Sequence, residues 1–243
     1  MTLVVAFLAS DSWVLASDTR LYETGFSLDP NTNQFISGTV TSSASKIQFD
    51  KESGIVFSFS GDGIGGLAGE LLIDKLRSTD ATHTRTLLNE VGNETFQKHI
   101  AGKSGINPAL SRDLLIIFTK KNPVELWTLG IRASSIPAHH ADKALIGDIA
   151  NGAKLLWQLY YSPEQTCEQL RLLAAHTILM GHESHESLVA GLEMWWGNNQ
   201  GTANPVEPTE LRQLATRSVE IDKRIAKLFN APFARLQRRT QII

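Results

Sequence analysis

Two polar residues near the start of the chain, Thr2 and Asp18, are of types that can take part in nucleophilic catalysis. Thr2 becomes the first residue once Met1 is removed, so one residue then carries both a hydroxyl and a free α-amino group. A threonine hydroxyl is a poor nucleophile at neutral pH, but an α-amino group with a pKa of about 8 can act as its base. A carboxylate beside this pair would make the arrangement useful for chemistry.

A predicted β-hairpin brings the two residues together. Residues 3–9 and 13–17 are apolar runs typical of strands, and a polar tripeptide separates them as a turn. Antiparallel strands of nearly equal length bring their outer ends together, so Asp18 and Arg20 are expected to lie near Thr2.

Composition limits the class of protein. The chain has 243 residues, 42% of them apolar, which is enough for one substantial core. Its net charge of -2 gives no reason to expect nucleic acid as a partner. A single cysteine, Cys167, excludes an internal disulfide and agrees with a reducing compartment. No apolar run is long enough for a membrane span and the start does not resemble a signal peptide, so we expect a cytoplasmic protein without membrane contact.

The remaining pattern predicts an α+β fold. Residues 21–45 are polar and are expected to form a functional or locally disordered loop, so that four strands precede the first helix. Strands are predicted at residues 46–50, 55–60, 113–119, 124–129, 144–146 and 188–196, and helices at 67–77, 82–100, 148–161 and from Ser162 to about Gly181. Helices that arrive in pairs between antiparallel strands favour a four-layer αββα sandwich of two antiparallel sheets.

The chain beyond residue 197 reads as an extension. We predict a main domain at residues 1–197 and, at 198–243, a linker followed by a helix. The helix carries an apolar stripe interrupted by Ser218, and we expect the stripe to pack on its own domain or on a neighbouring subunit. The apolar residues of the stripe are Leu211, Leu214, Ile221, Ile225 and Leu228.

The motifs around the hairpin resemble those of a known family. They are a strand after Thr2 leading to Ala-Ser-Asp18-x-Arg20, then Ser-Lys46-Ile at the start of a strand, and Phe-Ser58-Phe-Ser-Gly-Asp62 at the end of the next. This combination is similar to the proteasome β-subunit and its bacterial homologues, which are N-terminal nucleophile hydrolases. The resemblance covers residues 2–75 by motif and extends to Trp196 by element order.

The resemblance implies roles for individual residues. Lys46 would hold its charge beside the hydroxyl of Thr2, and Asp18 would pair with Lys46 and orient it. Ser58 stands where the family has a glycine whose N–H faces the oxyanion that develops in the reaction. Asp148 replaces an accessory serine of the family. Ser187 matches a second family serine.

One family residue has no single counterpart. The family places an aspartate three residues before the serine that Ser187 matches, and Glu183, Ser184 or Glu186 could stand in its place. Asp148 itself is better explained as a helix N-cap than as a catalytic group.

By resemblance, the chain would be a self-compartmentalising threonine peptidase that hydrolyses peptide bonds in peptides or unfolded proteins. It would need no cofactor or metal, assemble with itself into stacked homo-oligomeric rings, and work with an unfolding ATPase. The altered residues around Asp148 and Ser187 motivate an alternative, a ring-forming homologue without turnover.

Two unrelated sites are also conceivable. Gly61, Gly63 and Gly66 match a dinucleotide fingerprint between a strand and a helix, but no second strand ending in Asp or Glu follows at the required distance. His182 and His185 could bind a metal with Glu183 or Glu186, and His139 and His140 could join them. Because Gly181 is expected to end the helix, we interpret them as exposed loop histidines.

Overall fold

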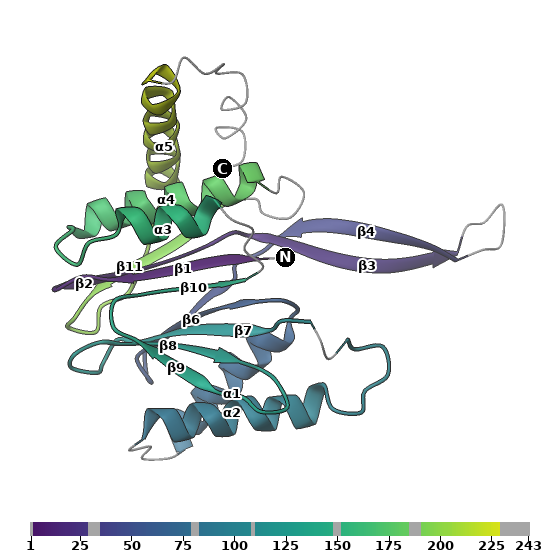
Figure 1. Ribbon diagram of the computed structural model, residues 1–243. Coiled ribbons are helices and arrows are strands. Elements are labelled where there is room, and N and C mark those ends of the chain that lie inside the picture. Colours follow the sequence, from purple (N-terminus) through teal and green to yellow (C-terminus); the bar gives the residue numbers. More distant parts are fainter. Residues whose placement is uncertain are drawn as a thin grey trace.

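The computed structural model describes residues 2–28, 35–78, 83–107, 110–147, 152–184 and 191–228 (Figure 1). The helices are α1 (Ile64–Ser78), α2 (Thr84–His99), α3 (Gly152–Tyr160), α4 (Cys167–Ser184) and α5 (Pro208–Leu228). The strands are β1 (Leu3–Leu8), β2 (Ser12–Ser17), β3 (Arg20–Leu28), β4 (Phe35–Ser43), β5 (Ile47–Asp50), β6 (Ile55–Ser60), β7 (Asp113–Phe118), β8 (Glu125–Gly130), β9 (Pro137–His140), β10 (Lys143–Gly147), β11 (Glu193–Asn198) and β12 (Asn204–Pro205).

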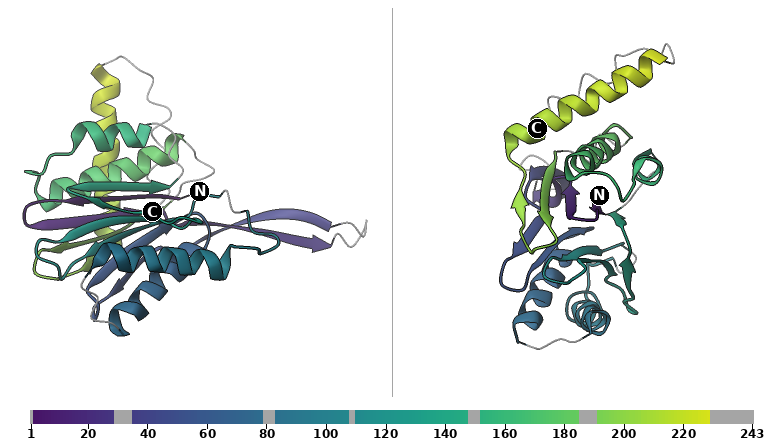
Figure 2. Two further views of the ribbon diagram at one scale, coloured as in Figure 1. Left: turned by 60° about the horizontal axis from the view of Figure 1, so that its bottom comes forward. Right: turned by 90° about the vertical axis from the view of Figure 1, so that its left-hand side faces the viewer.

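Two five-stranded antiparallel sheets face each other. The upper sheet has the order β10-β1-β2-β11-β12 and the lower sheet the order β5-β6-β7-β8-β9. Figures 1 and 2 show α3 and α4 on the outer face of the upper sheet and α1 and α2 on the outer face of the lower sheet. The predicted four-layer αββα sandwich is therefore confirmed.

The strand after Thr2 is buried on both faces. Val4 and Ala6 point into the core between the sheets, whereas Leu3, Val5 and Phe7 pack in the layer beneath α4. All five side chains are at most 2% exposed. A strand covered on both sides needs an unbroken apolar run, which is why this segment is the clearest strand in the sequence.

The register of β1 brings three chain segments to one edge of the sandwich. Val4 pairs with Ser17 of β2, and Leu3 pairs with Gly147 of β10. Gly147 has a φ of +110°, and a Cβ added there would lie 1.8 Å from the carbonyl oxygen of Thr2. Only glycine allows this close approach. Strand β10 therefore lies directly against the backbone of Thr2 and holds it in place.

The prediction of a loop at residues 21–45 was wrong for the part of this range that the structure describes. Within it, β3 and β4 pair over nine residues each and form a separate two-stranded sheet. This β3–β4 ribbon projects from the sandwich (Figures 1 and 2), and six strands, not four, precede α1. Because the two strands belong to neither five-stranded sheet, their sequence need not carry the apolar pattern that identifies core strands.

Helix α4 begins and ends later than predicted. The side chain of Gln169 accepts the N–H of Thr166 at 2.9 Å, and the hydroxyl of Thr166 accepts the N–H of Gln169 at 3.3 Å. This capping box starts α4 at Cys167, one turn after the box expected at Ser162. Gly181 does not end the helix, which continues to Ser184. The short strands β9 and β12 were not predicted.

The C-terminal stripe divides into two parts. Leu211, Leu214 and Ser218 are buried, and the first two belong to the core cluster that includes α4. Ile225 and Leu228 are 40% and 81% exposed, on the part of α5 that extends away from the body (Figure 2). The first half of the stripe therefore packs on its own chain. The division of the chain into two parts at residue 197 stays a prediction.

Among the described helices, none has the length and apolarity needed to span a membrane.

Candidate active site

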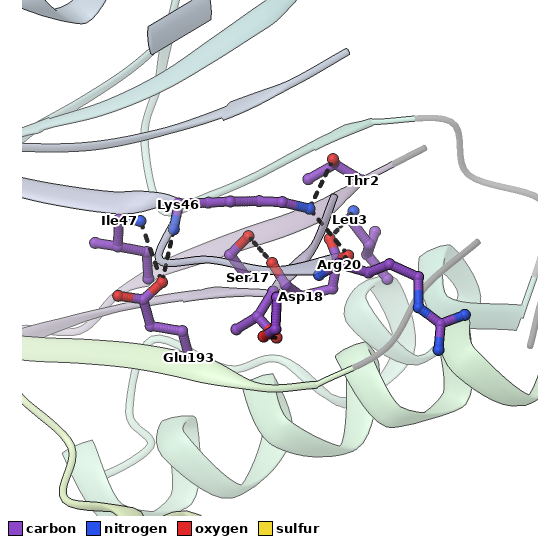
Figure 3. Close-up of polar contacts among 10 residues, drawn as sticks. Thr2, Leu3, Ser17, Asp18, Arg20, Lys46, Ile47 and Glu193 are labelled. Carbon is purple, nitrogen blue, oxygen red and sulfur yellow. Dashed lines mark hydrogen bonds and ion pairs between the residues drawn. The ribbon is translucent and has the colours of Figure 1, made fainter. Parts of the chain in front are cut away.

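Three polar residues meet at the edge where β1 begins and β2 ends. The ammonium of Lys46 donates to the hydroxyl oxygen of Thr2 at 3.0 Å and to the carboxylate of Asp18 at 3.0 Å (Figure 3). Thr2 and Asp18 come from the upper sheet, whereas Lys46 comes from the segment before β5 of the lower sheet. The structure thus brings together the three residues expected to carry catalysis, while Met1 lies outside the described residues.

Asp18 is fixed by backbone groups on two sides. One carboxylate oxygen accepts the N–H of Leu3 at 2.8 Å, and the other accepts the N–H of Arg20 at 3.2 Å. The N–H of Asp18 in turn donates to the carbonyl of Leu3 at 3.1 Å. Arg20 supplies its N–H to the carboxylate, and its guanidinium points away from Thr2 and Lys46 in Figure 3.

Burial makes this cluster electrostatically unusual. Asp18 and Lys46 are 0% exposed and Thr2 is 5% exposed. Burial raises the pKa of Asp18, opposed by Lys46 and by the N–H groups of Leu3 and Arg20. Burial lowers the pKa of Lys46, opposed mainly by Asp18. A buried ammonium 3.0 Å from a hydroxyl oxygen can stabilise negative charge that develops on that oxygen.

Glu193 of β11 also belongs to this site, although no sequence motif points to it. One of its carboxylate oxygens accepts the N–H groups of Lys46 at 2.9 Å and Ile47 at 3.3 Å (Figure 3). The other accepts the hydroxyl of Ser45 at 2.6 Å. The available signal was a single carboxylate inside the otherwise apolar run Leu-Glu193-Met-Trp-Trp. Pairing of β11 with β2 places Glu193 opposite Ser17, the neighbour of Asp18.

Ser58 lies inside β6, where it pairs with Ile47 on one side and with Leu115 on the other. In an antiparallel ladder, the N–H of such a residue points to one of its two strand neighbours. The role expected of this N–H at the oxyanion stays a prediction.

Of the remaining supporting residues Asp148, Ser184 and Ser187, the structure describes only Ser184. Asp148 and Ser187 lie outside the described residues, so neither the expected N-cap nor the match to a family serine is tested. Ser184 is the last residue of α4. Of the alternatives for the family aspartate, Glu183 precedes it in the same helix and Glu186 lies outside the described residues.

The dinucleotide interpretation of Gly61, Gly63 and Gly66 is wrong for this fold. Strand β6 is followed by two helices and then by the antiparallel strand β7, not by a parallel strand. Asp62 already occupies the start of α1, where its carboxylate accepts the N–H of Ile64 at 3.2 Å and pairs with Arg112 at 2.6 Å. Of the three glycines, Gly61 has a φ of +93°, and a Cβ on it would lie 2.5 Å from the carbonyl oxygen of Ser111, so the backbone conformation and packing at this turn explain its presence.

The histidines are distributed over separate elements. His139 and His140 lie in β9, and His182 belongs to α4 because that helix continues past Gly181. His185 lies outside the described residues. In the described part of the chain, no group of three or more His, Cys, Asp or Glu residues is arranged to hold a metal ion.

Comparison with known proteins shows similarity of fold. No family model matches the chain, and no curated protein matches it. The structure of Anbu (ancestral beta-subunit) from Yersinia bercovieri superimposes with a TM-score of 0.68 at 14% identity, covering 94% of this chain and 96% of that one. An Anbu (Gly-1) mutant from Hyphomicrobium sp. strain MC1 superimposes with a TM-score of 0.66 at 12% identity, covering 95% of this chain and 97% of that one.

These findings correct the family assignment drawn from the sequence motifs. The assignment to the bacterial proteasome-homologue branch of threonine hydrolases was wrong as a statement of family, because the structural neighbours are Anbu proteins, and at 12% to 14% identity they establish only the fold. No family model and no curated protein supports the narrower assignment. The chain has a proteasome-like αββα fold with a buried Thr2, Lys46 and Asp18 cluster at one edge.

Proposed function

We propose that the protein hydrolyses amide bonds of peptides through the hydroxyl of Thr2 after Met1 has been removed. The observation that carries this proposal is the position of the Lys46 ammonium, 3.0 Å from both the Thr2 hydroxyl oxygen and the Asp18 carboxylate. A structural ion pair would need only the second contact. The first contact places a positive charge at a potential nucleophile.

The proposed reaction has two stages. The Thr2 hydroxyl oxygen attacks the peptide carbonyl carbon, and the hydroxyl proton passes to the free α-amino group of Thr2. Collapse of the tetrahedral intermediate breaks the C–N bond, and the leaving amine takes that proton. Water then attacks the resulting ester, which releases the carboxylic acid and restores the Thr2 hydroxyl. Throughout the reaction, Lys46 stabilises charge on the Thr2 oxygen and Asp18 keeps Lys46 in place.

Replacement of Thr2 tests the nucleophile. We expect Thr2→Ala to abolish both hydrolysis of fluorogenic peptides and covalent labelling by a peptide epoxyketone, measured by intact mass. Thr216→Ala, on the exposed face of α5, removes another threonine hydroxyl and serves as the matched control. Unchanged turnover in Thr2→Ala would refute the assignment.

The state of the N-terminus separates this proposal from the alternative of a non-catalytic ring protein. Intact-mass measurement of purified protein should show loss of Met1, because the small side chain of Thr2 permits that removal. A retained Met1 would leave Thr2 without a free amine and favour the alternative. Stacked homo-oligomeric rings, an unfolding ATPase partner and a cytoplasmic location stay predictions of the sequence resemblance.

A further inference from the structure

Residues 44–46 form a short segment through which the projecting β3–β4 ribbon enters the site. The ribbon ends at Ser43 and β5 begins at Ile47, so the segment lies outside both sheets. Ser45 is exposed, whereas Lys46 is fully buried. The position of Lys46 therefore depends on what holds this segment against the sandwich.

Glu193 holds the segment with a single carboxylate. Its two oxygens accept the hydroxyl of Ser45 and the N–H groups of Lys46 and Ile47 at 2.6, 2.9 and 3.3 Å. Figure 3 shows this carboxylate beside the backbone of Lys46, at the opposite end of the lysine side chain from Thr2. Hydrogen bonds to an ionised carboxylate are stronger than bonds between neutral groups.

These contacts cross from one sheet to the other. Glu193 belongs to β11 of the upper sheet, whereas Ile47 begins β5 of the lower sheet. Two residues further along each strand, the rings of Phe49 and Trp195 meet at a centroid distance of 5.8 Å. The start of β5 is thus attached to β11 by a polar contact and then by an aromatic contact.

The attachment has a direct consequence for the Lys46 ammonium, which meets both of its acceptors at 3.0 Å. A displacement of the segment by one residue would move its backbone by about 3.3 Å and turn the side chain to the opposite face. Both contacts would then be lost.

On the basis of the proposed function, we propose that Glu193 is a positioning residue for this reaction. It fixes the backbone of residues 45–47 so that the Lys46 ammonium lies between Thr2 and Asp18, and its negative charge helps to keep that ammonium protonated. Burial lowers the pKa of Lys46, and the carboxylates of Asp18 and Glu193 both oppose this lowering. Glu193 acts through Lys46 and has no direct role at the substrate.

Two substitutions separate the backbone contacts from the charge. Glu193→Ala removes both, whereas Glu193→Gln keeps an oxygen that can accept the N–H groups of Lys46 and Ile47. We expect the rate of Thr2 labelling by a peptide epoxyketone to fall about 100-fold in Glu193→Ala, the loss associated with a misplacement of about 1 Å in a catalytic group. In Glu193→Gln the loss should be clearly smaller.

A titration of Lys46 provides a readout that does not depend on hydrolysis. With the Lys46 side chain observed by NMR, both variants should show a titration midpoint below that of the wild type. Glu125→Ala is the matched control, because Glu125 accepts hydrogen bonds from Thr84 and Trp127 away from the site. It should change neither labelling nor the Lys46 midpoint.

The outcomes distinguish this inference from the proposed function. If wild-type protein without Met1 is not labelled, the proposed function fails and the Lys46 titration alone decides the role of Glu193. An unchanged Lys46 midpoint in both variants would overturn the inference. If wild-type Thr2 is labelled, labelling of Glu193→Ala at the wild-type rate would also overturn the inference. If Glu193→Ala does not fold, the same two measurements on Glu193→Gln apply.

Discussion

The buried ion pair between Lys46 and Asp18 makes a testable contribution to stability. Both side chains are at most 1% exposed, and their charged atoms are 3.0 Å apart. In Lys46→Met, the Asp18 carboxylate remains buried without its counter-charge, although the N–H groups of Leu3 and Arg20 still bind it. Removing one partner of a buried pair typically costs 3–5 kcal/mol. Because two donors remain, we expect a loss of about 3 kcal/mol in the free energy of unfolding at pH 7.5.

The same loss should depend on pH. Without Lys46, the folded-state pKa of Asp18 rises further above the ordinary value of 3.8, because the main opposing charge is gone. A carboxyl group with a raised folded-state pKa stabilises the protein below its unfolded-state pKa, and this contribution disappears as the pH rises through the folded-state pKa. Acidification to pH 4.5 should therefore reduce the difference between Lys46→Met and wild type by at least about 1 kcal/mol, which corresponds to less than one pKa unit.

Urea unfolding followed by tryptophan fluorescence measures both effects, since Trp13 is fully buried. Arg217→Met is the control: it breaks the exposed pair between Arg217 and Glu168, and should cost less than about 1 kcal/mol at either pH. Adding Asp18→Asn to Lys46→Met should recover part of the loss, because the amide oxygen still accepts the N–H of Leu3. A loss below about 1 kcal/mol for Lys46→Met, or an equal loss at both pH values, would refute the reasoning.

Three further predictions concern the edge of the site, its titration and α5. Gly147→Ala places a Cβ 1.8 Å from the Thr2 carbonyl oxygen, so the rate of epoxyketone labelling should fall more than about 10-fold. Labelling of this variant at the wild-type rate would show that the strands tolerate the added Cβ. The wild-type labelling rate should fall with acid, as the α-amino group of Thr2 and then, at a pH above 3.8, Asp18 are protonated, and with alkali at a pH below 10.5, as Lys46 loses its proton; a constant rate between pH 4 and 10 would contradict these roles. Leu214→Ala should cost about 2–4 kcal/mol in urea unfolding and Leu228→Ala less than about 0.5, because these side chains are 3% and 81% exposed; equal losses would place the second half of α5 in an interface.

Local patterns were sufficient to predict the hairpin and most core strands. The run after Thr2 is apolar at every position, and the polar turn after it leaves one way to pair residues 3–8 with 12–17. The hairpin alone predicts that Thr2 and Asp18 lie close together. The sandwich followed from the order of strands and paired helices, because each paired-helix layer needs a sheet face to cover.

Such local patterns could not predict the contacts made between the two sheets of the sandwich. Glu193 is 147 residues from Lys46 in the sequence, and only the packing of β11 over β5 brings them together. The β3–β4 ribbon was missed for a related reason, since its two strands pair with each other and with neither of the five-stranded sheets. The role expected of Ser58 stays a prediction, because a sequence motif does not say to which side a backbone N–H points once the strand has neighbours on both sides.

The structure also explains why the site depends on the whole fold. Thr2 precedes β1 and Asp18 follows β2 of the upper sheet, and Lys46 reaches them from the segment that joins the β3–β4 ribbon to β5 of the lower sheet. Its ammonium and its backbone each bind a group of the upper sheet, the first through Asp18 and the second through Glu193. If the two sheets separated at this edge, the buried ammonium would lose its counter-charge at the same time as the hydroxyl of Thr2 lost its cation. The contacts that would activate Thr2 are therefore also contacts that hold the two sheets together at this edge.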